Sequence, residues 1–510
     1  MGREGTRTAL KLTALVALTI AAVVTPQPGR ASVSADGTLV VAISAGAAHT
    51  CAVTEAGGAK CWGDGNSGQL GDGIVGGSPI PVDVIGLDVA LASISAGDEH
   101  TCALTTGGGV KCWGALAIGK RADPPHICFF GFCWPVPADV EGLESGMAAV
   151  AAGAFHSCAL TSAGGVNCWG MNNAGVLGDG TTGNARIHPV DVCQDYDGVA
   201  EECRELLSGV SALAAGSSHN CVIMTVGGVK CWGANGAGEL GDGGACGQPC
   251  LTPVDVTGLE DDLAAVAAGF GHTCALTTAG GVKCWGKNFS GELGDGTTTN
   301  SSVPVDVVGL EGGVAAITAG GAHTCALTTM GDLKCWGNNF FGQLGIAQLG
   351  IGGRDPDPHP VPGDVVGLEE SVAAVDAGFL YTCAVTTAGG AKCWGNGDFG
   401  QLGDGLECRI GGDCSTPVDV VGLGPKPAPT PTATQTPAAP AGTPTATEAT
   451  PSPSAATSTP TAANSVTLPR TGTGGGDRSS VTPWVIAALA GAGAAAAGCA
   501  VLRARRHQVR

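Results

Sequence analysis

Short apolar segments separated by Gly-rich turns recur along most of the chain. In one copy the segments AAVAAG, HTCALT and GVKCW follow one another within residues 264–285, and PVDVVGL comes at 304–310. Segments of this length, rich in β-branched and small residues and bounded by Gly, Pro and Asn, are typical of β-strands. TTAGG, between the second and third segments, is typical of a hairpin turn, with Gly where a positive φ is needed. Each unit therefore predicts four strands.

The unit occurs seven times. Each copy has a His or Tyr, a Cys two residues later, and a second Cys followed by Trp-Gly. The Cys-Trp pairs are Cys61–Trp62, Cys112–Trp113, Cys168–Trp169, Cys231–Trp232, Cys284–Trp285, Cys335–Trp336 and Cys393–Trp394. The spacing between successive Trp residues is 51 to 63 residues, and such a period indicates a propeller or solenoid. Seven units of four strands predict an all-β fold, a seven-bladed β-propeller over residues 36–423.

The motif GxxHTxALT…GxVxxWGxNxxGQLGxG in these units resembles the repeat of the regulator-of-chromosome-condensation family. The resemblance covers about residues 38 to 423, and seven copies match the number of blades in that family. It implies the same propeller. The best-known member of the family exchanges guanine nucleotides on a nuclear GTPase, a role that we do not expect to transfer to an exported chain. This sequence departs from the family pattern by placing a Cys in each of the two central strands of every unit.

The two Cys residues of each unit are ten residues apart. If Cys51 faces Cys61 across the hairpin, Ala52 faces Lys60, Thr50 faces Trp62 and His49 faces Gly63, so each large residue lies opposite a smaller one. Directly opposed Cys residues on neighbouring strands are close enough for a disulfide. The alternative is a His-Cys-Cys metal site, which would have to recur in blade after blade. An exported chain favours disulfides, and we predict no bound metal.

This register predicts one cross-hairpin disulfide in every blade. The blade pairs are Cys51–Cys61, Cys102–Cys112, Cys158–Cys168, Cys221–Cys231, Cys274–Cys284, Cys325–Cys335 and Cys383–Cys393. Eight further Cys form the local pairs Cys128–Cys133, Cys193–Cys203, Cys246–Cys250 and Cys408–Cys414. Only Cys499 is left over, and it lies in a hydrophobic tail, so the count outside that tail fits full oxidation.

Both ends of the chain predict export and anchoring. Residues 1–31 resemble a secretory signal, with basic residues before an apolar core. Residues 424–467 form a Pro/Thr/Ala/Ser-rich linker that is either a plain spacer or a glycosylated stalk, and composition predicts that it is disordered. Residues 468–510 resemble a sortase signal, since Leu468-Pro469-Arg470-Thr471-Gly472 is followed by an apolar run at 484–502 and by arginines. That run is long enough to cross a bilayer, so a retained transmembrane anchor is the alternative. We predict an extracellular bacterial protein held at the cell wall or membrane, with sortase as one partner.

The net charge of −20 excludes one class of partner. An acidic surface repels phosphate backbones, so we expect no nucleic acid to bind. Residues found in nearly every blade are expected to build the fold. They include the six blade His residues with Tyr381 in the seventh blade, and the Asp of the LGDG turns, for which calcium binding is the alternative to hydrogen bonds with the local backbone.

Residues that differ between blades are the candidates for recognition. In a four-stranded meander, the first-to-second and third-to-fourth connections share one end of the ring, and all ten Phe lie in them. The predicted ligand-binding set is Phe129, Phe130, Phe132, Trp134, Phe155, Phe270, Phe289, Phe340, Phe341, Phe379 and Phe399. We interpret them as an aromatic recognition face. The alternative is that the rings pack loops onto the end of the ring.

These features favour a surface-displayed module that binds an extracellular protein or glycan. A second hypothesis is an inhibitor of an extracellular enzyme, because a secreted bacterial inhibitor of β-lactamase is similar to this type of propeller. A third is an enzyme acting on glycans or wall polymers. No catalytic constellation is visible in the sequence, and we predict no enzyme activity and no cofactor, although such sites are assembled in three dimensions.

Overall fold

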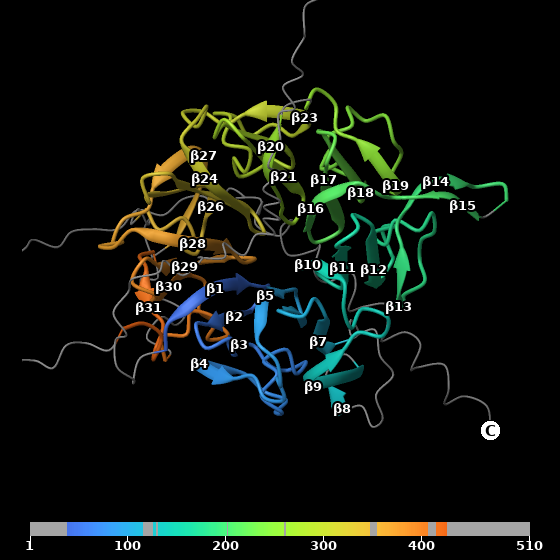
Figure 1. The fold of residues 1–510 in the computed structure, drawn as a ribbon. Helices are drawn as coiled ribbons and strands as arrows, with labels where there is room; N and C mark the ends of the chain where they lie inside the picture. Colours follow the sequence, from blue (N-terminus) through green and yellow to red (C-terminus); the bar gives the residue numbers. More distant parts are fainter. Residues whose placement is uncertain are drawn as a thin grey trace, which may run out of the picture. The chain divides into compact units, whose positions relative to one another are not determined.

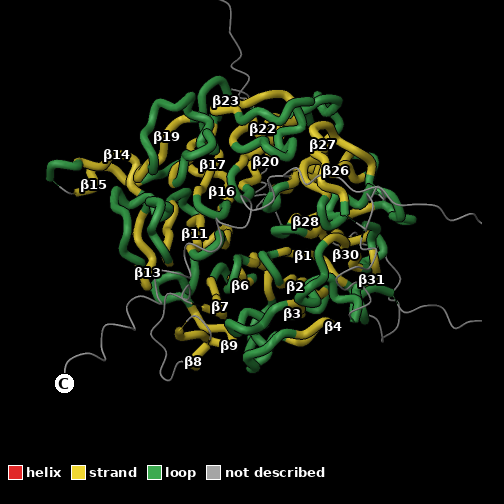
Figure 2. The backbone as a smooth tube through the Cα atoms, turned by 180° about the vertical axis from the view of Figure 1, so that it is seen from behind, coloured by secondary structure: helices red, strands yellow, loops and turns green. Residues whose placement is uncertain are grey.

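The computed structural model describes residues 38–115, 126–128, 131–200, 202–259, 262–346, 354–405 and 415–425. Seven antiparallel sheets stand around a central axis like the blades of a propeller (Figure 1). The described residues contain strands and loops and no helix, as Figure 2 shows from behind. None of them forms a helix able to cross a membrane. The predicted signal peptide, linker, sorting signal and apolar run at 484–502 lie outside the described residues.

Six blades are formed by four consecutive strands, with the first strand on the axis and the fourth at the rim, and blade 2 carries a fifth, short strand on its outer edge. Blade 1 contains β1 (Val40–Ala45), β2 (His49–Thr54), β3 (Ala59–Gly63) and β4 (Ser78–Asp83). Blade 2 contains β5 (Leu91–Ala96), β6 (His100–Thr105), β7 (Val110–Ala115), β8 (His126–Cys128) and β9 (Gly131–Asp139). Blade 3 contains β10 (Met147–Ala152), β11 (His156–Thr161), β12 (Val166–Gly170) and β13 (Arg186–Asp191). The hairpin of β14 (Cys193–Asp197) and β15 (Glu202–Leu206) follows blade 3.

The remaining four blades repeat the same order. Blade 4 contains β16 (Val210–Ala215), β17 (His219–Met224), β18 (Val229–Gly233) and β19 (Cys250–Asp255). Blade 5 contains β20 (Leu263–Ala268), β21 (His272–Thr277), β22 (Val282–Gly286) and β23 (Ser301–Asp306). Blade 6 contains β24 (Val314–Ala319), β25 (His323–Thr328), β26 (Leu333–Asn339) and β27 (Asp355–Asp364). Blade 7 contains β28 (Val372–Ala377), β29 (Tyr381–Thr386), β30 (Ala391–Gly395) and β31 (Val418–Asp419).

The predicted register of the central hairpin is confirmed. Cys51 faces Cys61, Ala52 faces Lys60, Thr50 faces Trp62 and His49 faces Gly63. Each blade carries the expected disulfide between its second and third strands. Cys193–Cys203 and Cys246–Cys250 are also bonded. The predicted pairs Cys128–Cys133 and Cys408–Cys414 involve side chains outside the described residues.

Hydrophobic cores lie between consecutive blades, and the Trp of each blade is their largest member. Trp285 of blade 5 packs with Leu240 and Val256 of blade 4, and its Nε1–H donates to the carbonyl of Glu239 at 2.9 Å. Gly241 of the LGDG turn has a φ of 69°, and a Cβ there would lie 2.8 Å from the Trp285 Nε1 atom. The turn therefore requires Gly both for its backbone conformation and for the approach of the indole.

The described part of the ring closes by packing of blade 7 on blade 1, and the described strands of blade 7 all come from residues 372–419. Thr38 forms a parallel bridge with Leu423, and the amide of Gly424 donates to the carbonyl of Thr38 at 2.9 Å. Trp62 donates to the carbonyl of Gln401 at 2.9 Å. The same bond to the preceding blade is made by Trp113, Trp232, Trp285, Trp336 and Trp394. Near the axis, the carboxylate of Asp376 accepts from the Ala45 amide at 2.9 Å and from the Thr318 hydroxyl at 2.8 Å. Asp376 thus connects blades 6, 7 and 1.

Removing one cross-hairpin disulfide is expected to weaken a single blade. The double change Cys274→Ala and Cys284→Ala frees a loop of ten residues in the unfolded chain and is expected to lower the free energy of unfolding by about 2–4 kcal/mol. Urea unfolding at neutral pH measures the loss. An unchanged urea midpoint, with thiol titration showing two fewer Cys per chain after reduction, would contradict the stabilising role of this disulfide.

Candidate functional site

The first-to-second and third-to-fourth connections lie together at one end of the ring, which we call the loop end. In all seven blades the residue that follows Trp-Gly donates its amide to a carbonyl of the first connection. Examples are Asp64 to Ala48 at 2.8 Å, Lys287 to Gly271 at 2.8 Å and Asn396 to Leu380 at 3.0 Å. The loop end is therefore a continuous layer of hydrogen-bonded connections, as the meander order predicts.

Five Phe side chains of the loop end are well exposed. The exposed fractions are 41% for Phe155, 50% for Phe270, 66% for Phe289, 41% for Phe379 and 56% for Phe399. Each of these five belongs to the predicted recognition face. Their exposure argues against the alternative in which neighbouring loops cover the rings, because large apolar side chains that stay in water are the ones available to a partner.

Phe340 and Phe341 form a separate, partly buried cluster in blade 6. Their ring centroids are 5.0 Å apart in an edge-to-face arrangement. The guanidinium of Arg354 lies 4.8 Å from the Phe340 centroid and 5.5 Å from that of Phe341. The amide of Phe341 donates to Gln343 Oε1 at 2.9 Å. These two rings therefore already have a cation as partner.

The insertion of blade 2 carries Trp134 and three Phe of the predicted recognition face. Residues 126–128 and 131–139 form a hairpin that adds β8 to the outside of β9, giving a five-stranded sheet. Trp134 faces Gly114 across the ladder and packs against the core between blades 2 and 3. Trp134, which belongs to the predicted recognition face, is therefore partly buried against this core. Phe129 and Phe130 lie outside the described residues, as does the side chain of Phe132.

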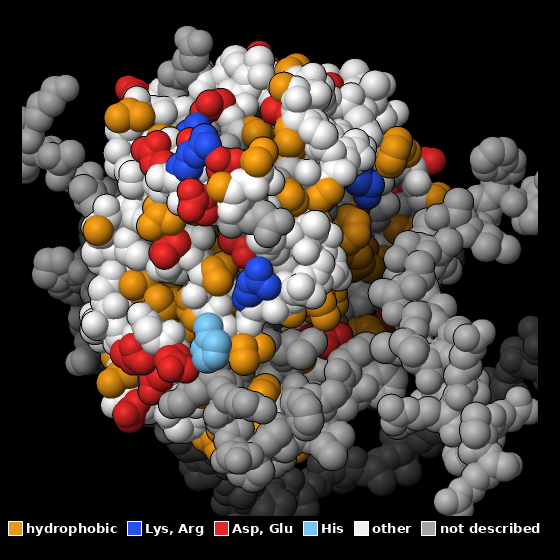
Figure 3. Space-filling model, turned by 90° about the vertical axis from the view of Figure 1, so that its right-hand side faces the viewer, with side chains coloured by type: hydrophobic (Ala, Val, Ile, Leu, Met, Phe, Trp, Pro, Cys, Tyr) orange, Lys and Arg blue, Asp and Glu red, His pale blue; other side chains and the backbone are white. Residues whose placement is uncertain are grey.

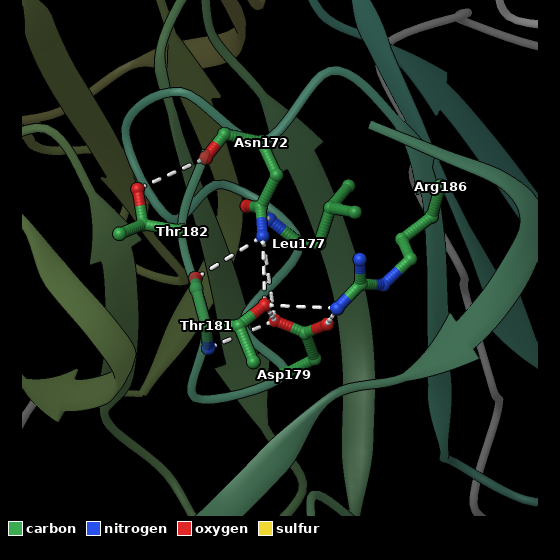
Figure 4. Close-up of polar contacts among 6 residues, drawn as sticks. All are labelled: Asn172, Leu177, Asp179, Thr181, Thr182 and Arg186. Carbon is green, nitrogen blue, oxygen red and sulfur yellow. Dashed lines mark hydrogen bonds and ion pairs between the residues drawn. The ribbon is translucent and has the colours of Figure 1, made fainter. Parts of the chain in front are cut away.

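Hydrogen bonds within the LGDG turns satisfy the Asp carboxylates. Figure 4 shows the turn of blade 3, where Asp179 Oδ1 accepts from the amide and the hydroxyl of Thr181 at 3.0 and 2.6 Å. Asn172 donates to the same oxygen at 3.4 Å, and Arg186 lies 3.3 Å from Asp179 Oδ2. Asp72, Asp242 and Asp295 likewise accept the amide two residues on. The predicted hydrogen bond between the Asp carboxylate and the local backbone is present. A calcium ion would need the Asp179 oxygens free to coordinate it, and in blade 3 they already face Thr181, Asn172 and Arg186.

One further group has the composition of a metal site. Asp242, Cys246 and Cys250 place a carboxylate oxygen and two sulfurs within 4.8 Å of one another. The two sulfurs are bonded to each other as a disulfide, so they offer no thiolate. The Asp242 carboxylate accepts the amides of Gly244 and Cys246. These three side chains therefore stabilise a turn, through a disulfide and hydrogen bonds, and do not form a set of metal ligands.

The blade His residues connect neighbouring blades. His49 Nε2 lies 2.8 Å from the Thr101 hydroxyl of blade 2, and His272 Nε2 lies 2.9 Å from the Thr324 hydroxyl of blade 6. The other four bond in the same way to Ser157, Asn220, Thr273 and Thr382. In blade 7, Tyr381 donates to the carbonyl of His49 at 2.6 Å. The predicted structural role therefore takes the form of a ring of bonds between blades.

Burial keeps these imidazoles neutral. It lowers the pKa of His49, His100, His272 and His323 to about 3, and that of His156 and His219 to about 4. Desolvation is the main cause in all six, because a buried imidazolium would lose its hydration. Burial also raises the pKa of Tyr381. None of the seven has the access to solvent that a general acid or base needs.

Three carboxyl groups near the axis are perturbed in the opposite direction. Burial raises the pKa of Asp98 and of Asp376 to about 6 and that of Glu99 to about 7, although the Ser67 hydroxyl opposes the last shift. Asp98 and Glu99 stand in the first connection of blade 2, at the loop end. Sequence reasoning missed this pair, although it is the only acidic pair directly before a blade His.

Comparison with known proteins gives a consistent family match. The model described as "Regulator of chromosome condensation (RCC1) repeat" matches all seven blades, at residues 40–69, 91–115, 147–176, 210–239, 264–292, 314–343 and 372–401. A second model with the same description matches residues 227–276 and 279–327. Each match of the second model begins near the second-to-third turn of one blade and ends in the second strand of the next.

The chain is similar to the ultraviolet-B receptor UVR8 of Arabidopsis thaliana, with 30% identity over 370 residues that cover 72% of this chain and 79% of the receptor. Among solved structures it is similar to Prp20p of Saccharomyces cerevisiae, with a TM-score of 0.58, 22% identity, and coverage of 75% of this chain and 87% of Prp20p. It is also similar to yeast RCC1 (Prp20) bound to Kap60, with a TM-score of 0.59, 20% identity, and coverage of 82% and 91%. At these identities the solved structures bear on the fold alone.

Proposed function

This chain belongs to the regulator of chromosome condensation (RCC1) repeat family, and from that premise we propose that its propeller is a binding module that recognises an extracellular protein or glycan through its loop end. The observation that carries the proposal is the set of five exposed Phe rings there. Tyr, Trp and Phe supply much of the energy in interfaces. Loops on a rigid scaffold are the usual place for recognition residues.

Proteins with this fold support a binding role. Prp20p binds Gsp1p and histones, and its structure has been solved with Kap60. The present chain differs in its disulfides, which are typical of exported proteins, and we propose that it is displayed outside a bacterial cell through its C-terminal segment. We do not propose guanine nucleotide exchange, because fold alone does not carry that activity.

Acidic side chains outnumber basic ones on one flank of the ring (Figure 3). In Figure 3, carboxylate side chains are spread over the flank beside β13, β14 and β19, and only a few basic side chains accompany them. The β14–β15 hairpin contributes part of this acidity through Asp195, Glu202 and Glu205. An acidic surface of this kind supports a partner other than nucleic acid.

Three alanine substitutions at the loop end test the proposal. The full chain, oxidised, is screened against arrays of extracellular proteins and glycans beside the variant Phe155→Ala, Phe289→Ala, Phe399→Ala. We expect the variant to lose at least tenfold in affinity for a ligand of the native chain, because three exposed rings no longer contribute apolar area.

The matched control changes exposed apolar residues at the opposite end of the ring. Val226→Ala and Met330→Ala alter the second-to-third turns of blades 4 and 6, where the side chains are 92% and 81% exposed. We expect this control to bind as the native chain does. If the Phe variant binds and the control does not, recognition takes place at the end opposite the loop end, which contradicts the proposed site. If the folded native chain binds no ligand in the arrays, the proposed binding function itself is contradicted.

A further inference from the structure

A cavity opens along the axis of the propeller, enclosed by the seven inner strands β1, β5, β10, β16, β20, β24 and β28. Its volume is about 160 Å³, and its wall consists mostly of Ala, Gly, Ser and Thr. The second residue of the first connection of each blade lines the mouth of the cavity at the loop end. These mouth residues are Ala47, Asp98, Ala154, Ser217, Phe270, Gly321 and Phe379.

One side of the mouth is acidic. Asp98 and Asp376 are the charged residues among the described residues that line the cavity, and these include no Lys or Arg. The Asp376 carboxylate has partners in the wall, at Ala45 and Thr318. The carboxylate of Asp98 receives no hydrogen bond and no ion pair from any residue that the structure describes, and only its backbone amide is bonded, to Ala154 at 3.2 Å. The raised pKa of Asp98 is the expected result for a partly buried carboxylate without a cation beside it.

The other side of the mouth is aromatic. Phe270 and Phe379 meet edge to face, with ring centroids 5.6 Å apart. They meet across Gly321 of blade 6, where a Cβ would lie 2.6 Å from Phe379 Cδ2 and 2.3 Å from the Phe379 carbonyl oxygen. The Phe270 ring already has one cation near its face, since Lys287 Nζ lies 5.9 Å from its centroid. Lys287 itself is held by Glu292 at 3.3 Å.

We propose that the mouth receives an arginine side chain of a protein partner, with the guanidinium at the Asp98 carboxylate and the methylene stem against the Phe270–Phe379 pair. This inference rests on the proposed binding function and adds the chemistry of the partner. A guanidinium is planar, weakly hydrated and able to bond a carboxylate with two N–H groups, and it also stacks on aromatic rings. The net charge of −20 favours the approach of a basic partner.

The test uses two peptides that differ in one charge. Ac-Gly-Gly-Arg-Gly-Gly-amide is titrated into the full chain beside the same peptide with citrulline, which keeps the shape of arginine and lacks its charge. We expect the arginine peptide to bind at least tenfold more tightly than the citrulline peptide. Equal affinity of the two peptides, or no arginine binding at 10 mM, would overturn the proposal.

Three variants assign the site. Asp98→Asn removes the charge with little change of shape, and we expect it to abolish the preference for arginine. Phe379→Leu keeps an apolar side chain, removes the aromatic ring, and is expected to weaken binding severalfold. The control Asp332→Asn removes an exposed carboxylate at the opposite end of the ring and is expected to bind as the native chain does. Undiminished arginine binding in Asp98→Asn, with the near-ultraviolet circular dichroism of the native chain, would also overturn the proposal.

The results separate this inference from the proposed function. A partner whose binding depends on Phe289 and Phe399 and is unaffected by Asp98→Asn would leave the binding function standing and refute the arginine site. Arginine binding at Asp98 without any partner in the array screen would support the site and contradict the broader function.

Discussion

Acidification from pH 7 to pH 5 is expected to destabilise the propeller by many kcal/mol, through the six buried His residues. In the unfolded chain an imidazole takes up a proton below its ordinary pKa of 6.5, whereas in the fold burial keeps each of the six neutral down to about pH 3 or 4. Between these values the unfolded chain holds more protons. The free energy of unfolding therefore has its highest value above pH 6.5, as far as these His residues determine it, and it decreases as the pH falls below 6.5.

The expected slope follows from the number of protons. Uptake of six protons on unfolding corresponds to a slope of about 8 kcal/mol per pH unit. Three carboxyl groups oppose it, because their raised pKa values let the folded chain bind protons in this range. With Asp98, Glu99 and Asp376 included, the slope falls toward about 4 kcal/mol per pH unit. A domain is typically stable by only about 5–15 kcal/mol, so we expect unfolding near pH 5. Urea midpoints measured at pH 7, 6, 5.5 and 5 give the slope.

A single substitution checks the cause. Gln can place an amide near the position of the imidazole Nε2, so His272→Gln is expected to keep a bond to Thr324 and to reduce the slope by about one proton. His188→Gln, at an exposed His beside Glu141, is the control and should leave the slope unchanged. Equal free energies of unfolding at pH 7 and pH 5 would show that the buried His residues do not govern acid stability.

Truncation of a blade Trp is expected to have the second largest effect. Trp285→Ala removes a fully buried indole from the core between blades 4 and 5 and is expected to cost about 3–5 kcal/mol. It also removes one of two donors to the Glu239 carbonyl, which the Thr273 hydroxyl still reaches at 2.8 Å. Urea unfolding of the oxidised variant measures the loss.

A conservative pair of variants isolates the contribution of the N–H group. Trp285→Phe keeps most of the ring and removes the 2.9 Å bond to Glu239, and it is expected to cost about 1–3 kcal/mol. Trp134→Phe is the matched control, because the Trp134 Nε1 is buried without an acceptor among the described residues. Trp285→Phe should lower the free energy of unfolding more than Trp134→Phe does. The reverse order would mean that the bond between blades contributes little and that shape alone places the indole.

The repeated features of the fold were predictable because they depend on near neighbours. Cys51 and Cys61 are ten residues apart around a tight turn, so the alternation of small and large residues fixes their register. The role of His49 was not predictable in this way, since its partner Thr101 lies in the next blade. A signal exists nonetheless. The residue after each blade His or Tyr is always Thr, Ser or Asn. In blades 2 to 7 this side chain forms the hydrogen bond with the His of the preceding blade.

The candidate site was predicted in part. The exposed Phe rings lie in the connections that the strand order assigns to one end of the ring. Trp134 instead packs against the core, because it belongs to the long strand at residues 131–139, which the sequence pattern did not predict. Asp98 escaped notice because the sequence does not show whether a carboxylate has a cationic neighbour. Only the folded ring reveals that the described residues lining the cavity beside it include no Lys or Arg.

The parallel bridge between Thr38 and Leu423 brings the two ends of the propeller to one seam. A pulling force on the C-terminal end would act first on β31, whose two residues make it the shortest fourth strand in the ring. Once this strand detaches, the seam between blades 7 and 1 bears the load. The disulfide of each blade shields the nine residues between its two Cys from extension, so the ring would lengthen in short steps, blade by blade, under tension.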